Sequence, residues 1–241
     1  MNRIAFLALA GALTLTACDS TDPEPDPIPL NVQTAADVEA DLAIGFGPQG
    51  PVGRDLFTLF DLDTGQIVLS SNETDAATRA ADSTGTAWDI GFRTTTIIVN
   101  SGISGPGSVE AQLLTETFAS VTEAPAAGYL ADGDNTCPAV QTPVGPAPGV
   151  PYAICTGSDN GWYNYNQPTN LVSPIPGRTI VLQTSEGNFA KIRILSYYQG
   201  NPVAPVTTPG DPNADASRYY TFEYVVQPDG SRGFETTVPD A

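Results

Sequence analysis

The chain has 241 residues, with 9 Lys and Arg against 27 Asp and Glu, a formal net charge of −18 and no His. Nucleic-acid binding is not expected of so acidic a protein, since phosphates must be neutralised by cations, and adhesion to an anionic lipid surface is disfavoured for the same reason. Without His the commonest general base is missing, and no G-x-S-x-G motif is present, so we do not expect an enzyme.

The first residues have the features of a lipoprotein signal peptide. A positive start with Arg3 precedes an apolar run over residues 4–15, shorter than the roughly 20 residues of a membrane-spanning helix. The run ends in Leu-Thr-Ala-Cys, which resembles a bacterial lipobox. We therefore predict that residues 1–17 are removed and that acylated Cys18 attaches the chain to membrane lipid. An ordinary secretory signal cut near Ala17 is the alternative.

Residues 18–30 predict a tether. The stretch DSTDPEPDPIP is rich in Pro and acids and has almost nothing apolar, so it cannot bury enough surface to fold by itself. Its prolines favour an extended form of about 3.1 Å per residue. We expect this segment to lift a single folded domain, residues 31–241, clear of the membrane.

The remaining chain predicts an all-β fold of antiparallel hairpins. Residues 31–46 suggest a short helix or an irregular lead-in, and no later segment has sustained helical periodicity. Alternating, β-branched runs separated by Gly-containing turns predict strands. These runs are residues 55–62 with 66–70, residues 88–100, residues 179–184 with 189–198, and residues 219–227 with 233–238.

Residues 101–178 are rich in loops, and we expect any binding site to draw on them, because long connections usually serve a function. Within this region Cys137 and Cys155 are predicted to form a disulfide, since they are the cysteines left once Cys18 is lipidated. Their spacing fits no zinc site, and we predict no metal site.

Four segments in fixed order resemble a known family. They are WDIGFRTTTIIVNSGISGPG from residue 88, GWYNYN from residue 161, TIVLQTSEGNFAKIRILSYY from residue 179 and YYTFEYVVQPDG from residue 219. Behind a lipobox, this order is similar to the HmuY-type haem-binding lipoproteins of Bacteroidetes-type bacteria, over roughly residues 50–235. The resemblance implies a hand-shaped β-sandwich with long central loops, displayed at the outer membrane, that passes haem to a TonB-dependent receptor.

The iron ligands of that family have no counterpart here. They are His or Met, and the only Met of this chain is Met1. Tyr phenolate can also bind ferric haem, although a loop Tyr more often packs its ring. Arg178 and Arg93 are candidate partners for haem propionates, and Lys191 is expected to form an ion pair. The candidate ligand-binding tyrosines are Tyr129, Tyr152, Tyr163 and Tyr165.

Two hypotheses follow from these features. The first is a surface lipoprotein that binds haem, a porphyrin or a related apolar ligand without His or Met ligation. The second is a structural or protein-interaction lipoprotein that has lost haem binding. The second hypothesis predicts central loops packed flat, with no cleft beside them.

Overall fold

The computed structural model describes residues 28–47, 50–142, 145–209 and 211–237. The predicted signal peptide and Cys18 lie outside these residues. Two antiparallel sheets form the body, which confirms the all-β prediction. The larger sheet has, in spatial order, β2 (Gln33–Glu39), β16 (Ser217–Gln227), β15 (Phe189–Tyr198), β14 (Thr179–Gln183) and β9 (Glu110–Leu114). The smaller has β6 (Gln66–Leu69), β5 (Thr58–Asp61), β7 (Ile90–Arg93) and β8 (Thr96–Val99).

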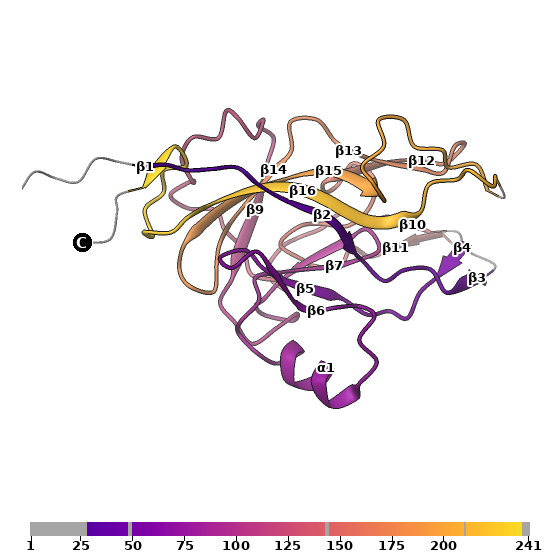
Figure 1. The fold of residues 1–241 in the computed structure, drawn as a ribbon, viewed down its shortest axis with the longest axis horizontal. Coiled ribbons are helices and arrows are strands. Elements are labelled where there is room, and N and C mark those ends of the chain that lie inside the picture. Colours follow the sequence, from indigo (N-terminus) through magenta and orange to yellow (C-terminus); the bar gives the residue numbers. More distant parts are fainter. Residues whose placement is uncertain (1–27, 48–49, 143–144, 210, 238–241) are drawn as a thin grey trace, which may run out of the picture.

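The two sheets are stacked, with the larger above the smaller and the short helix α1 (Ala76–Ser83) below both (Figure 1). No helix among the described residues has the length and apolar character needed to cross a membrane. Four two-stranded ribbons complete the described part of the chain. They are β1 (Ile28–Pro29) with β17 (Thr236–Thr237), β3 (Gly45–Gly47) with β4 (Gly50–Val52), β10 (Val140–Thr142) with β11 (Gly145–Ala147), and β12 (Tyr163–Asn166) with β13 (Leu171–Pro174).

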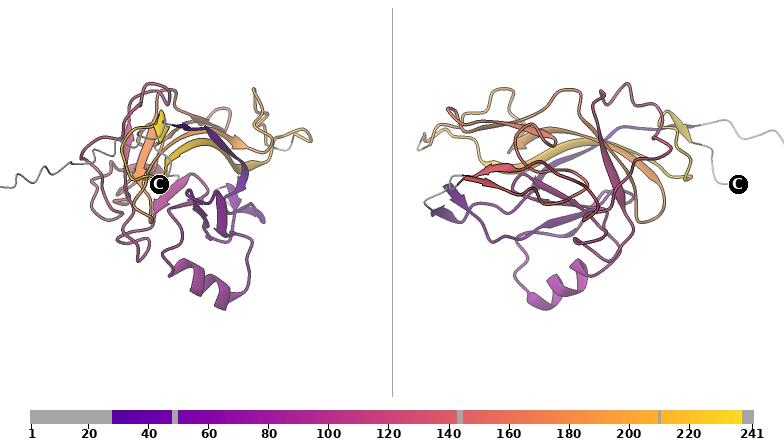
Figure 2. Two further views of the ribbon diagram at one scale, coloured as in Figure 1. Left: turned by 60° about the vertical axis from the view of Figure 1, so that its left-hand side comes forward. Right: turned by 180° about the vertical axis from the view of Figure 1, so that it is seen from behind.

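The ribbons lie at opposite ends of the molecule. The β3–β4, β10–β11 and β12–β13 hairpins extend from one end, whereas β1 and β17 lie at the other (Figures 1 and 2). The described chain therefore begins at the end remote from the three hairpins. Ile28 pairs with Thr237, so the last residues of the predicted tether already belong to a strand.

Aromatic side chains fill the space between the sheets. Tyr220, Phe222 and Tyr224 alternate along β16 and are almost completely buried. Phe222 lies 5.4 Å from Phe60 of β5 and 5.3 Å from Phe92 of β7, measured between ring centroids. Because alternate residues of a strand point to one face, this single strand packs against two strands of the opposite sheet.

Apolar and polar side chains alternate along β15, as the sequence predicts, but Lys191 on this strand does not form the expected ion pair. Ile192 and Ile194 face the core between the sheets, while Lys191 points to the outer face of the larger sheet. Its Nζ donates to the carbonyl oxygens of Phe118 at 2.9 Å and Val121 at 2.8 Å, so the expected ion pair is wrong. Burial lowers the pKa of Lys191, and the two carbonyls hold the segment after β9 over the sheet.

Two local predictions are wrong because tertiary pairing overrides weak local preference. Residues 31–46 contain β2 rather than a helix, and β2 is stabilised by pairing with β16. The run 233–238 does not pair with β16, because β15 and β2 already occupy both edges of β16. Strand β17, within this run, pairs with β1 instead.

The helix α1 and the strand β9 were not predicted. Helix α1 is Ala-rich, has no buried residue and is too short to show periodicity; it begins at Asp75, whose carboxylate accepts the backbone N–H of Thr78 at 2.8 Å. Strand β9 lies within the region expected to be loops and pairs with β14 through five residue pairs. Residues 101–178 therefore contribute to the body as well as to the hairpins.

Asp89 joins the two sheets and makes stability depend on pH. It is fully buried, and its carboxylate accepts the backbone N–H groups of Leu62 at 2.8 Å and Ser185 at 2.7 Å. Burial raises its pKa from 3.8 to about 6. Between these values the folded chain keeps a proton that the unfolded chain has lost, so the Asp89 contribution to stability falls as pH rises.

We predict that the wild-type free energy of unfolding falls by about 2–3 kcal/mol relative to Asp89→Asn between pH 4 and pH 7, because each pKa unit corresponds to about 1.4 kcal/mol. Urea denaturation of both proteins at a series of pH values measures the difference. Parallel pH profiles would show that the buried carboxyl does not titrate in this range.

Candidate functional site

An open groove with a volume of about 490 Å³ separates the β10–β11 hairpin from the β12–β13 hairpin. Its lining comes from segments far apart in the chain, including the turn between β7 and β8. The lining residues are Thr95, Ala139, Val140, Gln141, Thr156, Gly157, Ser158, Asn160, Tyr163, Tyr165 and Val172. The central loops are therefore not packed flat, contrary to what the interaction-module hypothesis predicts.

A covalent bond and a buried carboxylate hold the β10–β11 hairpin. Cys137 and Cys155 form the predicted disulfide, which brackets the hairpin on both sides. Asp132, only 1% exposed, accepts the backbone N–H of Val99 at 3.0 Å and of Ala153 at 2.7 Å. Burial raises the pKa of Asp132. These contacts connect the segment that carries the hairpin to strand β8.

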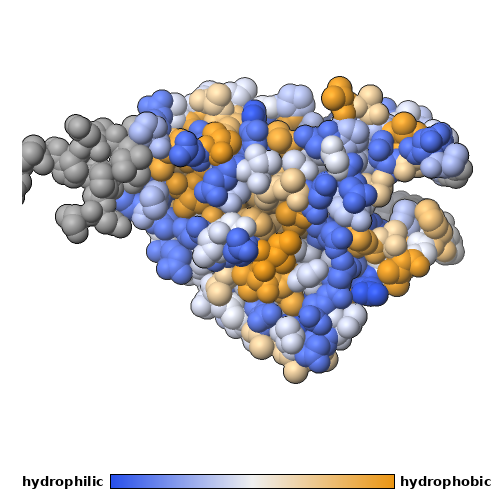
Figure 3. All heavy atoms as spheres, in the orientation of Figure 1, coloured by the Kyte–Doolittle hydropathy of each residue, from blue (hydrophilic) through white to orange (hydrophobic). Residues whose placement is uncertain are grey.

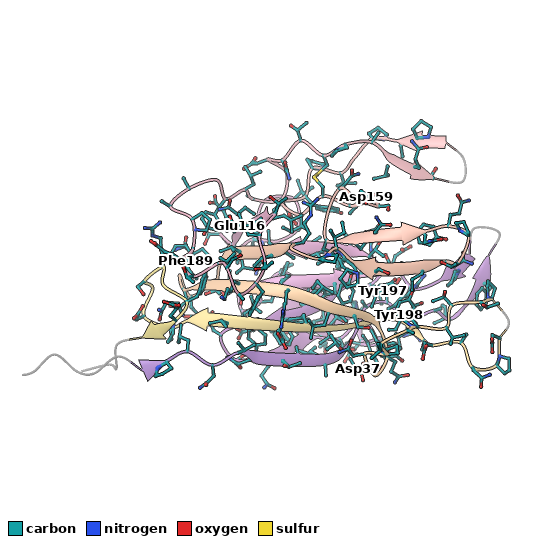
Figure 4. The ribbon with its side chains drawn as sticks, turned by 90° about the horizontal axis from the view of Figure 1, so that it is seen from above. Asp37, Glu116, Asp159, Phe189, Tyr197 and Tyr198 are labelled. Atoms are coloured by element: carbon teal, nitrogen blue, oxygen red, sulfur yellow. A yellow bond between two sulfur atoms is a disulfide. The ribbon has the colours of Figure 1, made fainter. Side chains whose placement is uncertain are left out.

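The β12–β13 hairpin is held by aromatic residues. The indole N–H of Trp162 donates to the carbonyl of Thr95 at 2.9 Å, and the Tyr163 hydroxyl accepts from Thr95 Oγ1 at 3.3 Å. On β13, the backbone N–H of Val172 donates to the Tyr198 hydroxyl at 2.9 Å. Figure 4 shows Tyr197 and Tyr198 at the end of β15, beside the base of this hairpin. The groove floor is thereby tied to both sheets.

Of the four candidate tyrosines, the structure brings Tyr163 and Tyr165 together in the groove. Tyr165 is 41% exposed, and its hydroxyl donates to Asn170 Oδ1 at 2.9 Å. Tyr163 is 8% exposed and packs against Trp162 with ring centroids 5.0 Å apart. Tyr165 therefore offers the accessible phenol ring, and Tyr163 forms part of the wall.

The other candidates lie elsewhere. Tyr129 packs 6.0 Å from Phe189 on the outer face of the larger sheet, where burial raises its pKa to about 12. Tyr152 packs against the outer face of the smaller sheet. Arg178 lines a separate space of about 10 Å³ beside Trp162. These three do not line the groove, and their contribution to ligand binding stays a prediction.

The groove is electrically neutral. None of the described residues that line it is charged, although the chain carries a net charge of −18. The charge nearest in sequence is Asp159, exposed between the lining residues Ser158 and Asn160. It precedes β12 (Figure 4), and its carboxylate accepts from Ser158 Oγ at 3.3 Å. An anionic ligand therefore finds no cation in the lining.

Sequence reasoning missed most of the lining, including Val140, Gln141, Asn160 and Val172. These residues are small or polar and belong to no motif. One feature of the sequence could have pointed to them: residues 135–158 and 160–177 contain no Asp, Glu, Lys or Arg. In a strongly acidic protein, two long uncharged stretches separated by one Asp indicate a surface whose chemistry differs from the rest.

Three carboxylates form a cluster outside the groove and stabilise the fold. Asp61, Asp63 and Asp89 place carboxylate oxygens within 4.8 Å of one another. Asp61 accepts the backbone N–H groups of Asp63 and Thr64, and Asp63 accepts from Asn188 Nδ2 at 2.7 Å. Most of these oxygens thus receive hydrogen bonds from turns, and the cluster lies outside the groove.

Replacing both Cys137 and Cys155 by Ser should lower the free energy of unfolding by about 3 kcal/mol, because the bridge restricts the unfolded chain. The sequence separation of the pair is 18 residues. Urea denaturation measures the loss, and limited proteolysis should show new cleavage within residues 138–151. Reduction of the wild-type protein is the matched control and should reproduce both effects; unchanged stability in both would contradict the assignment.

Comparison with known proteins places the chain in a family. The model of the family "HmuY protein" matches residues 54–224. An apo HmuY analogue of Tannerella forsythia is 16% identical, with 86% of this chain and 100% of that chain covered and a TM-score of 0.44. Apo PinO of Porphyromonas gingivitis is 13% identical, with 81% and 97% covered and a TM-score of 0.41. No curated protein matches the chain. The family match spans well over half of the sequence, and the protein belongs to the HmuY family.

Proposed function

We propose that this protein is a surface-displayed binding protein that captures haem or a related porphyrin in the groove between the β10–β11 and β12–β13 hairpins. The observation that carries the proposal is the open groove of about 490 Å³ with the exposed ring of Tyr165 at its wall. Family membership supplies the ligand class, since a solved HmuY-like relative from Bacteroides vulgatus is named as a haem-binding protein.

Ring contacts rather than iron ligation hold the ligand in this account. The chain has no His, and the lining described above contains no Met or Cys. What the groove does offer is the face of Tyr165, the apolar surfaces of Val140 and Val172, and the neutral polar groups of Gln141 and Asn160. Flat aromatic ligands are stabilised by such surfaces through stacking and burial. The geometry therefore fits a porphyrin ring better than it fits an iron coordination site.

We propose further that acylated Cys18 anchors the protein in the outer membrane and that a TonB-dependent receptor accepts the ligand. The first described strand, β1, lies at the end remote from the groove (Figure 1). A membrane attachment on that side would leave the groove facing away from the lipid. A similar solved structure from Bacteroides fragilis carries the name lipoprotein, which agrees with the proposed anchoring.

We predict that ferric haem and iron-free protoporphyrin IX bind with similar affinity, because the iron contributes little. Tyr165→Ala should weaken the affinity for each ligand by about tenfold, since an aromatic contact is worth about 0.5–1.5 kcal/mol beyond its buried area. Tyr165→Phe should bind both ligands with the wild-type affinity. Absorbance and tyrosine-fluorescence titrations measure the affinities.

Tyr129→Phe is the matched control, because Tyr129 lies on the outer face of the larger sheet. It should bind both ligands like the wild type. If the wild type bound haem much more tightly than protoporphyrin, and if Tyr165→Phe abolished that difference, the Tyr165 phenol would be shown to ligate iron. Absence of saturable binding of either ligand would overturn the proposed function.

A protein-interaction role is the second candidate, and one observation favours it. Phe46 and Val52 of the β3–β4 hairpin are 83% and 49% exposed, and Ile44, directly before β3, is 63% exposed. This hairpin lies at the same end as the groove, and hydrophobic residues gather there (Figure 3). Exposed apolar side chains of this kind commonly mark contact surfaces. Porphyrin titration separates the candidates, since a pure interaction module would bind no porphyrin.

A further inference from the structure

We infer that the groove selects porphyrins whose carboxylates lie along a single edge and rejects porphyrins with carboxylates around the whole ring. The inference rests on the proposed function and adds the class of porphyrin that the site accepts. The carrying observation is the juxtaposition of a charge-free groove with the Asp159 carboxylate in an acidic protein.

Long uncharged segments gather at the end of the molecule that holds the groove. Four segments without Asp, Glu, Lys or Arg contribute to it, namely residues 42–53, 135–158, 160–177 and 194–210. They contain the β3–β4, β10–β11 and β12–β13 hairpins and the loop after β15, which lie at one end in two perpendicular views (Figures 1 and 4). Asp159 and Asp215, which accepts the backbone N–H of Val206 at 2.7 Å, lie beside these segments, but neither lines the groove.

Many cations of the described chain are engaged by the protein itself, away from the groove. Arg232 pairs with Glu123 at 2.5 Å, and the Arg93 guanidinium lies 4.5 Å from the centre of the Phe57 ring. The Arg218 guanidinium donates to the carbonyl of Asp41 at 2.6 Å. A ligand carboxylate inside the groove would thus lose its water without gaining a cationic partner, which is unfavourable.

Asp159 adds repulsion to this desolvation cost. Its backbone N–H donates to the carbonyl of Tyr163 at 3.0 Å, which fixes the residue at the start of β12 beside the lining. Repulsion between two carboxylates decreases with separation and is screened over about 8 Å at physiological ionic strength. A ring with carboxylates on one edge can turn that edge to water, where screening removes most of the repulsion.

The rest of the lining accepts the uncharged edges of such a ring. Val140 and Val172 offer apolar surface to methyl and vinyl groups, and Tyr165 offers an aromatic face. Gln141 and Asn160 contribute neutral amides. Protoporphyrin IX, with both propionates on one side, satisfies these conditions, whereas coproporphyrin III, with a propionate on every pyrrole, places at least one carboxylate against the lining.

Equilibrium fluorescence titrations of the purified protein with protoporphyrin IX and coproporphyrin III test the inference. At low salt we expect coproporphyrin III to bind at least about tenfold more weakly, because of the unpaired carboxylates in the groove. Its affinity should increase as salt rises from about 20 mM to about 300 mM, since screening weakens repulsion. Protoporphyrin IX should respond less to salt.

Gln141→Lys places a cation in the lining, and Gln66→Lys, at an exposed position on β6, changes the net charge equally outside the groove. We expect Gln141→Lys to reduce the ratio of the affinities for protoporphyrin IX and coproporphyrin III by about tenfold. Gln66→Lys should leave this ratio unchanged. Equal or tighter binding of coproporphyrin III by the wild type, or affinity that falls with salt, would overturn the selectivity while leaving porphyrin capture intact. If neither porphyrin binds, the proposed function fails and this inference fails with it.

Discussion

An aromatic row on β16 packs against the opposite sheet and holds the two sheets together. Phe222 lies against Phe60 and Phe92, and Tyr220 lies 4.7 Å from Phe92 and 5.1 Å from Trp162 between ring centroids. The same aromatic row therefore also contacts Trp162, whose hydrogen bond to Thr95 positions the β12–β13 hairpin. Burial of large aromatic surfaces is the main source of stability in such a core.

The consequence for function is a groove carried by irregular segments but positioned by rigid ones. Trp162 connects the core to the turn at Thr95, the disulfide closes the base of β10–β11, and the Tyr198 hydroxyl receives the backbone N–H of Val172. Binding sites on loops are effective when a scaffold fixes the loop ends. Here hydrogen bonds and one covalent bond do so, which leaves the lining residues available for a ligand.

Much of the fold could be predicted from the sequence, because strand alternation is a local property. The runs around β5, β6, β7, β8, β14 and β15 are apolar, β-branched and bounded by turn residues, so their pattern alone indicates strands. Strand β2 and the pairing of β17 could not be predicted, because both depend on partners far away in the chain.

The candidate site was only partly predictable for a similar reason. Tyr163 and Tyr165 were singled out as loop tyrosines, yet Tyr129 and Tyr152 have the same local character and face other surfaces. Which loop residues meet is decided by the disulfide and by β9, not by residue type. The charge-free stretches on either side of Asp159 were visible in the sequence, but their meaning depends on knowing that they face each other across the groove.

In the proposed function, the groove between the two hairpins holds the porphyrin. Paramagnetic broadening of backbone amide signals by ferric haem, followed by NMR on isotope-labelled protein, locates the ligand directly. We expect the amides of Thr95, Gly157 and Val172 to broaden first, because these residues line the groove. Broadening centred on the outer face of the larger sheet, near Phe118 and Tyr129, would show that the ligand binds outside the groove.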